Sequence, residues 1–94
     1  MVTTTRPAAA ALPFVRTQDD ETIRFWVPER SGDYAVDCET GRRYARDLLV
    51  LIRSEGNPAL FGSVIRAMGE VQVFGGVEIG FCSHIGIELI GLGG

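Results

Sequence analysis

The sequence predicts a two-layer α+β domain in the order β-β-α-α-β-β, with an antiparallel sheet and two adjacent helices packed on one of its faces. Three observations indicate this fold. Apolar residues recur at every second position near both ends of the chain, two stretches of helical periodicity lie side by side in its middle, and eight of the twelve glycines occur from residue 69 onward. Together they favour a hairpin, a helical pair and a second hairpin.

The first 18 residues predict a flexible N-terminal arm, and residues 19–94 a single domain. The arm combines threonine, alanine and two prolines without any periodicity. Leu12, Phe14 and Val15 are its large apolar residues apart from the first two positions. We expect that these three side chains either cover a patch on the folded body or leave that patch open to a partner.

Two alternating stretches predict the first hairpin. Residues 22–27 place Ile23, Phe25 and Val27 on one side, with Arg24 and Trp26 on the other. Proline 28 ends this strand, and a turn-rich segment follows at 29–33. Residues 34–39 then alternate again, which predicts a second strand that points the thiol of residue 38 inward.

The middle of the chain predicts two helices joined by a very short connection. Thr40 can cap a helix that runs through residue 42 to about residue 54 and presents a broad apolar face. Gly56 suits the left-handed position that closes this helix, and Asn57-Pro58 supplies the start of the next one. The second helix is expected to end near Gly69 and to share a core with the first.

The C-terminal quarter returns to a period of two and predicts the second hairpin. Its apolar positions are Val71, Val73, Val77, Ile79, Phe81, Ile85, Ile87 and Leu89. A three-residue loop at 74–76 keeps the apolar residues of both strands on the same face, whereas a two-residue loop at 75–76 does not. The last strand is expected either as one bent element over residues 77–90 or as two pieces.

Composition restricts the class of protein. Ninety-four residues with 46% hydrophobic and 22% charged side chains are typical of one globular domain, and association with a copy of itself or with a partner is one route to greater stability. The net charge of −3, with both signs spread along the chain, does not indicate a nucleic-acid partner. No apolar run approaches the length of a membrane span. Two cysteines 44 positions apart favour a reducing cytoplasm, and no cofactor is expected.

Candidate chemistry centres on the single histidine, His84. A lone histidine excludes a two-histidine metal site within one chain. Strand alternation places Glu78, Cys82 and His84 on one face, where the thiol and the imidazole could form a reactive pair or share a metal. The more ordinary interpretation is a polar patch on the outer side of a sheet, and we expect neither a catalytic residue nor a bound metal.

A second candidate is a group of arginines on the first helix. Arg42, Arg43 and Arg46 occupy its predicted first turns, where the positive end of the helix dipole disfavours cations. They predict either an anion or RNA contact or ion pairs with nearby acids such as Asp47. Asp33, Asp37 and Glu39 precede this helix, and we interpret them as turn and helix-start residues.

These observations predict a non-enzymatic protein–protein interaction or regulatory module, such as a small inhibitor or adaptor of the kind that phages and mobile elements encode. Its expected binding face lies on the sheet opposite the helices and contains Trp26, Arg24, Cys82, His84 and Glu78. A large aromatic residue among small neighbours is typical of partner-binding surfaces. A protein partner of unknown identity, or a second copy in a homodimer, is expected there. The alternatives are a thiol- or metal-dependent enzyme centred on Cys82 and His84, and anion or RNA binding through the arginines.

Overall fold

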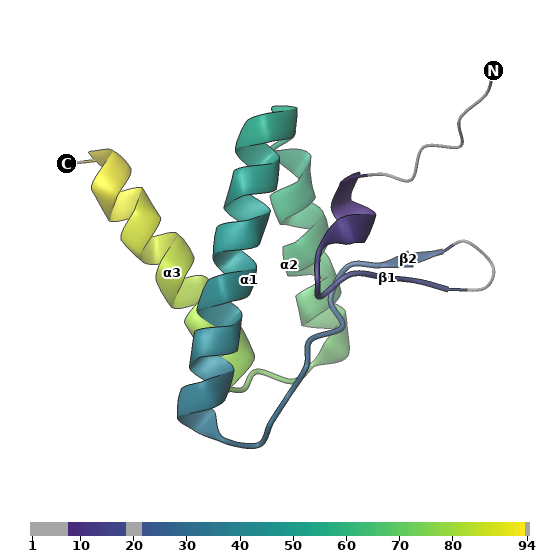
Figure 1. The fold of residues 1–94 in the computed structure, drawn as a ribbon, viewed down its shortest axis with the longest axis vertical. Coiled ribbons are helices and arrows are strands. Elements are labelled where there is room, and N and C mark those ends of the chain that lie inside the picture. The colour runs from purple at the N-terminus through teal and green to yellow at the C-terminus, as the bar shows by residue number, and fades with distance from the viewer. Residues whose placement is uncertain (1–7, 19–21, 94) are drawn as a thin grey trace.

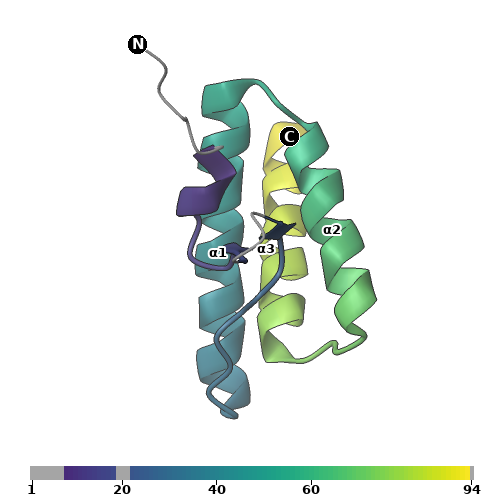
Figure 2. The same ribbon diagram turned by 90° about the vertical axis from the view of Figure 1, so that its right-hand side faces the viewer.

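The computed structural model describes residues 8–18 and 22–93 and is mostly helical. A short 3-10 helix η1 (Ala8–Ala11) leads into a two-stranded sheet of β1 (Arg16–Thr17) and β2 (Ile23–Arg24). Three helices follow: α1 (Tyr34–Glu55), α2 (Ala59–Val71) and α3 (Gly76–Gly93). In the view of Figure 1, α3 and α2 appear on opposite sides of α1, whereas in the view of Figure 2 α3 appears between α1 and α2; the hairpin projects on the side of α2 (Figure 1).

The predicted α+β fold with four strands is therefore wrong. The two strands pair antiparallel with each other, Arg16 opposite Arg24 and Thr17 opposite Ile23, and neither pairs with residues 34–39 or 77–90. Of the predicted strand at 22–27, only Ile23–Arg24 forms one. The predicted strands at 34–39 and 77–90 are helical, and the strand predicted at Val71 and Val73 falls at the end of α2 and in the connection that follows it.

The first helix begins at Tyr34, seven residues before the start predicted from a cap at Thr40, and that predicted cap is wrong. Asp33 caps it, and its carboxylate accepts a hydrogen bond of 3.1 Å from the backbone N–H of Val36. The predicted helix over residues 42–54 is confirmed as part of α1, and its end at Gly56 is confirmed as well, because that residue has the left-handed conformation with φ 61°. A run of alternating apolar residues over 34–38 is too short to distinguish a strand from one turn of an amphipathic helix.

Two glycines of the C-terminal region, Gly76 and Gly80, lie in α3 where this helix meets α1. A Cβ atom on Gly80 would overlap the carbonyl oxygen of Cys38, and one on Gly41 would overlap that of Val77. A Cβ on Gly76 would come within 2.9 Å of the Asp37 side chain. Glycine normally weakens a helix, but here it permits backbone-to-backbone packing that no other residue allows. We call these three glycines, 41, 76 and 80, the glycine seam.

The second helix is confirmed, although it ends later than the sequence predicts. It runs past Gly69 to Val71, and Gln72 takes the left-handed conformation that terminates it, with φ 60°. The connection between α1 and α2 is short, with Asn57 accepting a hydrogen bond of 3.2 Å from the N–H of Ala59. Val64 and Met68 bring α2 into the common core.

The described part of the predicted N-terminal arm, residues 8–18, is packed onto the helices rather than extended into solvent. Phe14 is fully buried at the centre of an aromatic cluster, with ring centroids 5.2 Å from Trp26, 5.0 Å from Tyr44 and 6.2 Å from Phe81. Of the two alternatives that the sequence leaves open for this apolar patch, coverage by the arm is the one observed, because Phe14 packs on the buried Trp26. Residues 1–7 of the predicted arm lie outside the described residues.

Candidate docking surface

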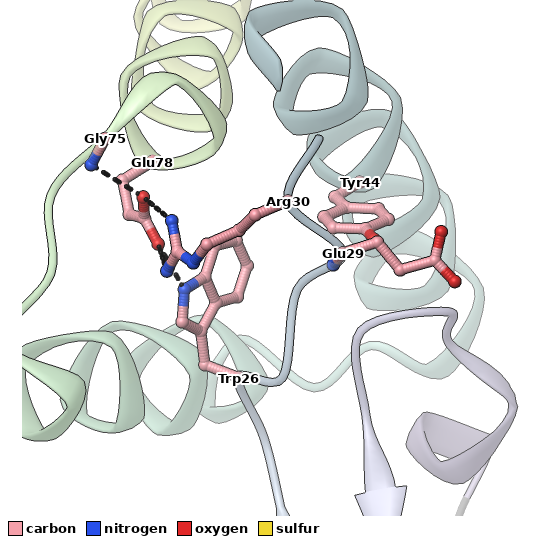
Figure 3. A network of polar contacts seen from close by, with 6 residues as sticks. All are labelled: Trp26, Glu29, Arg30, Tyr44, Gly75 and Glu78. Carbon is pink, nitrogen blue, oxygen red and sulfur yellow. Dashed lines mark hydrogen bonds and ion pairs between the residues drawn. The ribbon is translucent and has the colours of Figure 1, made fainter. Parts of the chain in front are cut away.

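A buried carboxylate anchors the start of α3. Glu78 is fully buried and lies close to the indole of Trp26 and the guanidinium of Arg30 (Figure 3). Its Oε2 accepts hydrogen bonds of 2.8 Å from Trp26 Nε1 and 2.6 Å from Arg30, while Oε1 accepts bonds of 2.9 Å from Arg30 and from the N–H of Gly75. The last bond is the backward half of a capping box, in which the third residue of a helix bonds the N–H of the cap residue. The carboxylate thus accepts hydrogen bonds from four donors, and these bonds hold the start of α3 against Trp26 and Arg30, which lie in the connection between β2 and α1.

The surroundings of Glu78 keep it ionised. Burial by itself raises the pKa of this carboxyl, but the hydrogen bonds from Arg30, Trp26 and the Gly75 backbone outweigh burial, so that its pKa lies below the usual range. In turn, the hydrogen bond to Glu78 is the main cause that raises the pKa of Arg30. The pair is therefore charged at neutral pH.

Three carboxylates gather where two helices begin side by side. α1 and α3 run in the same direction from neighbouring N-termini (Figures 1 and 2), so the positive ends of their dipoles lie together. Asp33 caps α1, Asp37 lies in the first turn of α1, and Glu78 lies in the first turn of α3. Asp37 accepts hydrogen bonds of 2.8 Å from both the N–H and the hydroxyl of Ser31, which lower its pKa. These acids offset the electrostatic cost of a parallel helix pair.

Beyond this anchor, α3 presents an uncharged surface. The side of the helix that faces away from α1 carries only apolar or small residues, which we call the outward face: Ile79, Cys82, Ser83, Gly86, Leu89 and Ile90. The exposed fraction is 63% for Leu89 and 76% for Ile90. Figure 1 shows α3 diverging from α1 toward its C-terminal end, with no other described element on its far side.

Both acidic residues of α3 point away from this face. Glu78 lies in the buried network, and Glu88 lies 3.7 Å from Arg53 on α1 and 3.9 Å from the imidazole of His84. A solvent-facing helix surface ordinarily carries charged residues. Because the acids of α3 are turned inward, its outward face is an exposed apolar surface without charge.

A shallow cavity of about 400 Å³ lies between the hairpin and α2. Residues of both elements line it: Ile23, Arg24, Phe25, Trp26, Ser63, Arg66, Ala67, Glu70 and Val71. The lining combines apolar side chains with the charged residues Arg24, Arg66 and Glu70. This is where the structure places Arg24, one of the residues that the sequence predicts in the binding face.

The structure does not bring the predicted binding residues onto one surface. Trp26, with an exposed fraction of 2%, and Glu78 are core residues bonded to each other, whereas Arg24 and Cys82 are exposed on separate elements. The sheet face that was expected to carry them does not exist, because residues 76–93 are a helix. Sequence reasoning missed the outward face of α3. A helical interpretation of residues 76–93 would have found it, since the only acids there lie ten residues apart.

Cys82 and His84 also separate once their segment is helical. Residues two apart in a helix point about 200° away from each other, so the thiol faces outward while the imidazole faces α1. Burial, together with the charge of Glu78, raises the pKa of the Cys82 thiol, which lowers its thiolate fraction. His84 Nε2 is buried and has no hydrogen-bond partner among the described residues. The described residues contain no group of three or more potential metal ligands.

The arginine group occupies the middle of α1 rather than its first turns. Glu39 lies 2.7 Å from Arg42 and 3.6 Å from Arg46, and its pKa is lowered chiefly by the hydrogen bond from Arg42. Because α1 begins at residue 34, the expected conflict with the helix dipole disappears. Within the described part of the chain, Arg43 has no ion pair, and the pairing with Asp47 is not observed. Anion binding by these arginines stays a prediction.

Comparison of the chain with protein-family models, curated proteins and solved structures gives no match. Among the helices of residues 8–18 and 22–93, none combines the length and apolar character needed to cross a bilayer.

Proposed function

We propose that this chain is a non-enzymatic protein–protein interaction module that binds its partner through the outward face of α3. The observation that carries the proposal is the exposure of Leu89 and Ile90 on a helix face without any charge. Burying a leucine or isoleucine side chain completely is worth about 1.5–3 kcal/mol. With two-thirds to three-quarters of each side chain exposed, each offers a partner roughly 1–2 kcal/mol.

The rest of the fold supports this role by holding α3 firmly while leaving one side of it open. The glycine seam attaches the first half of α3 to α1, and the hydrogen bonds of Glu78 attach it to the connection between β2 and α1. A preorganised apolar face binds with less loss of conformational entropy than a disordered one. The proposal includes a cytoplasmic setting, which the free thiols of Cys38 and Cys82 favour.

Site-specific photo-cross-linking in the native host tests the proposal. A photoreactive phenylalanine analogue replaces Ile90, and in a matched variant it replaces Val50, an exposed apolar residue on α1 with an exposed fraction of 64%. A protein adduct of discrete mass is expected from position 90 and not from position 50. No adduct from position 90, or the same adducts from both positions, would contradict the proposal.

A further inference from the structure

We infer that the outward face of α3 binds a second copy of this chain, with the two α3 helices antiparallel and crossing at Gly86. This inference rests on the proposed function and names the partner. In an antiparallel pair centred on Gly86, two residues of the two copies lie at the same level when their residue numbers add up to 172. Ser83 then lies opposite Leu89 of the other copy, and Cys82 opposite Ile90.

This register places a large side chain against a small one at each level. Leu89 and Ile90 are exposed projections, whereas Cys82, Ser83 and Gly86 leave space beside them. Interdigitation of this kind is how helices pack at the density of a protein interior. A glycine at the crossing point allows the axes to approach toward the lower end of the usual range of about 8–10 Å.

A parallel pair of α3 helices would pack these side chains less well. In a parallel pair centred on the same glycine, Ile90 would meet Ile90 and Ser83 would meet Ser83, so that large residues collide at one level and small residues leave a gap at another. Both orientations give a two-fold symmetric homodimer, so the preference for the antiparallel pair rests on the sizes of the facing side chains. Because the face is uncharged, juxtaposing two copies brings no like charges together.

The size of the outward face determines how strongly two copies are expected to associate. From residue 79 to residue 90 it extends over about 17 Å of helix, at a rise of 1.5 Å per residue. Such a stripe is smaller than the roughly 800 Å² per partner of a standard interface. We therefore expect a weak dimer that is populated at roughly 100 µM and dissociated at roughly 1 µM.

Sedimentation velocity of the purified chain between about 1 and 300 µM tests self-association. The wild type is expected to shift from monomer to dimer over this range, and Ser83→Glu, which places a carboxylate opposite Leu89, is expected to remain monomeric at about 300 µM. Val50→Glu, an equivalent charge on the exposed side of α1, is expected to dimerise like the wild type. Leu89→Lys provides a second monomeric variant, and circular dichroism checks that each variant is folded.

Disulfide cross-linking tests the orientation. Ile90→Cys is expected to form a covalent dimer on mild oxidation, because residue 90 lies opposite the native Cys82 of the other copy. The double variant Ile90→Cys, Cys82→Ser is expected to lose this product, while Cys38 is buried and takes no part. Cross-linking of the double variant would mean a parallel pair and would overturn the inferred register.

A wild type that remains monomeric at about 300 µM would overturn self-association. The proposed function would then stand or fall separately on the photo-cross-linking experiment, in which the mass of the adduct distinguishes this chain from a different protein.

Discussion

Replacing Glu78 with glutamine is expected to destabilise the fold by about 2–4 kcal/mol. The amide keeps the shape of the side chain but removes its charge, and it turns an N–H₂ group toward donors that now bond a carboxylate oxygen. A hydrogen bond to a charged group contributes about 1.5–3 kcal/mol, and removing one partner of a buried ion pair costs about 3–5 kcal/mol. Arg30 keeps an exposed fraction of 32% and can regain water, which lowers the second figure.

The loss is large for a chain of this size. At roughly 0.05–0.15 kcal/mol per residue, the whole domain is stable by about 5–14 kcal/mol. Urea unfolding followed by circular dichroism, with wild type and variant side by side, measures the difference. Glu39→Gln serves as the matched control, because this carboxylate is exposed and pairs only with exposed arginines, and little change is expected.

The free energy of unfolding at low pH provides a second measurement of the same substitution. Because the pKa of Glu78 is lowered in the folded state, the unfolded chain binds more protons at low pH. The stabilisation is present above the unfolded pKa of about 4.3 and is lost as the pH falls through the folded pKa. Glu78→Gln should reduce this dependence on pH and leave the part due to Asp37 and Glu39, whose pKa values are also lowered. If the free energy of unfolding of Glu78→Gln lay within about 0.5 kcal/mol of the wild-type value, and its dependence on pH in acid were unchanged, this reasoning would be refuted.

Three further substitutions and one thiol reaction test the packing. Gly80→Ala should unfold the chain or cost several kcal/mol, since its Cβ meets backbone, whereas Gly62→Ala, with open space around it, should stabilise the fold by about 0.5–1 kcal/mol; thermal unfolding of both gives the sign. Phe14→Ala should cost about 3–5 kcal/mol in urea unfolding, and a change below about 1 kcal/mol would mean that residues 8–18 do not belong to the core. Alkylation of Cys82 with iodoacetamide should have a pH midpoint above that of a model thiol, because the pKa of Cys82 is raised; a midpoint at or below the model value would contradict its described environment.

Local signals predicted the middle of the fold correctly, and long-range contacts decided the parts that were predicted wrongly. Gly56 and Asn57 mark the junction of α1 and α2 by their own conformational preferences, which need no tertiary context. Gly76 and Gly80 carry no such preference for a helix. They are helical because of what lies against them, namely the backbone of α1, and a single sequence does not reveal that neighbour.

The candidate site was predicted wrongly for the same reason, because its arrangement depends on long-range contacts. The sequence predicted Trp26 as an anchor because of its size, but its indole N–H and its ring are both satisfied within the core. In a strand, a period of two puts Cys82 and His84 on the same face, whereas the helix that residues 76–93 form separates them. The exposed Ile90 could be recognised only after the helix and its packing against α1 were known.

The glycine seam also sets the order in which this chain can fold. The Cys38 carbonyl and Gly80 lie 42 residues apart in the sequence, and all of α2 must be looped out before they meet. Closing such a loop costs entropy before any contact compensates for it, so helical proteins with distant contacts fold more slowly than those with neighbouring ones. We therefore expect α1 and α2 to associate early and the parallel pair of α1 and α3 to form last, so that this apolar helix is the part of the chain most exposed to aggregation during folding.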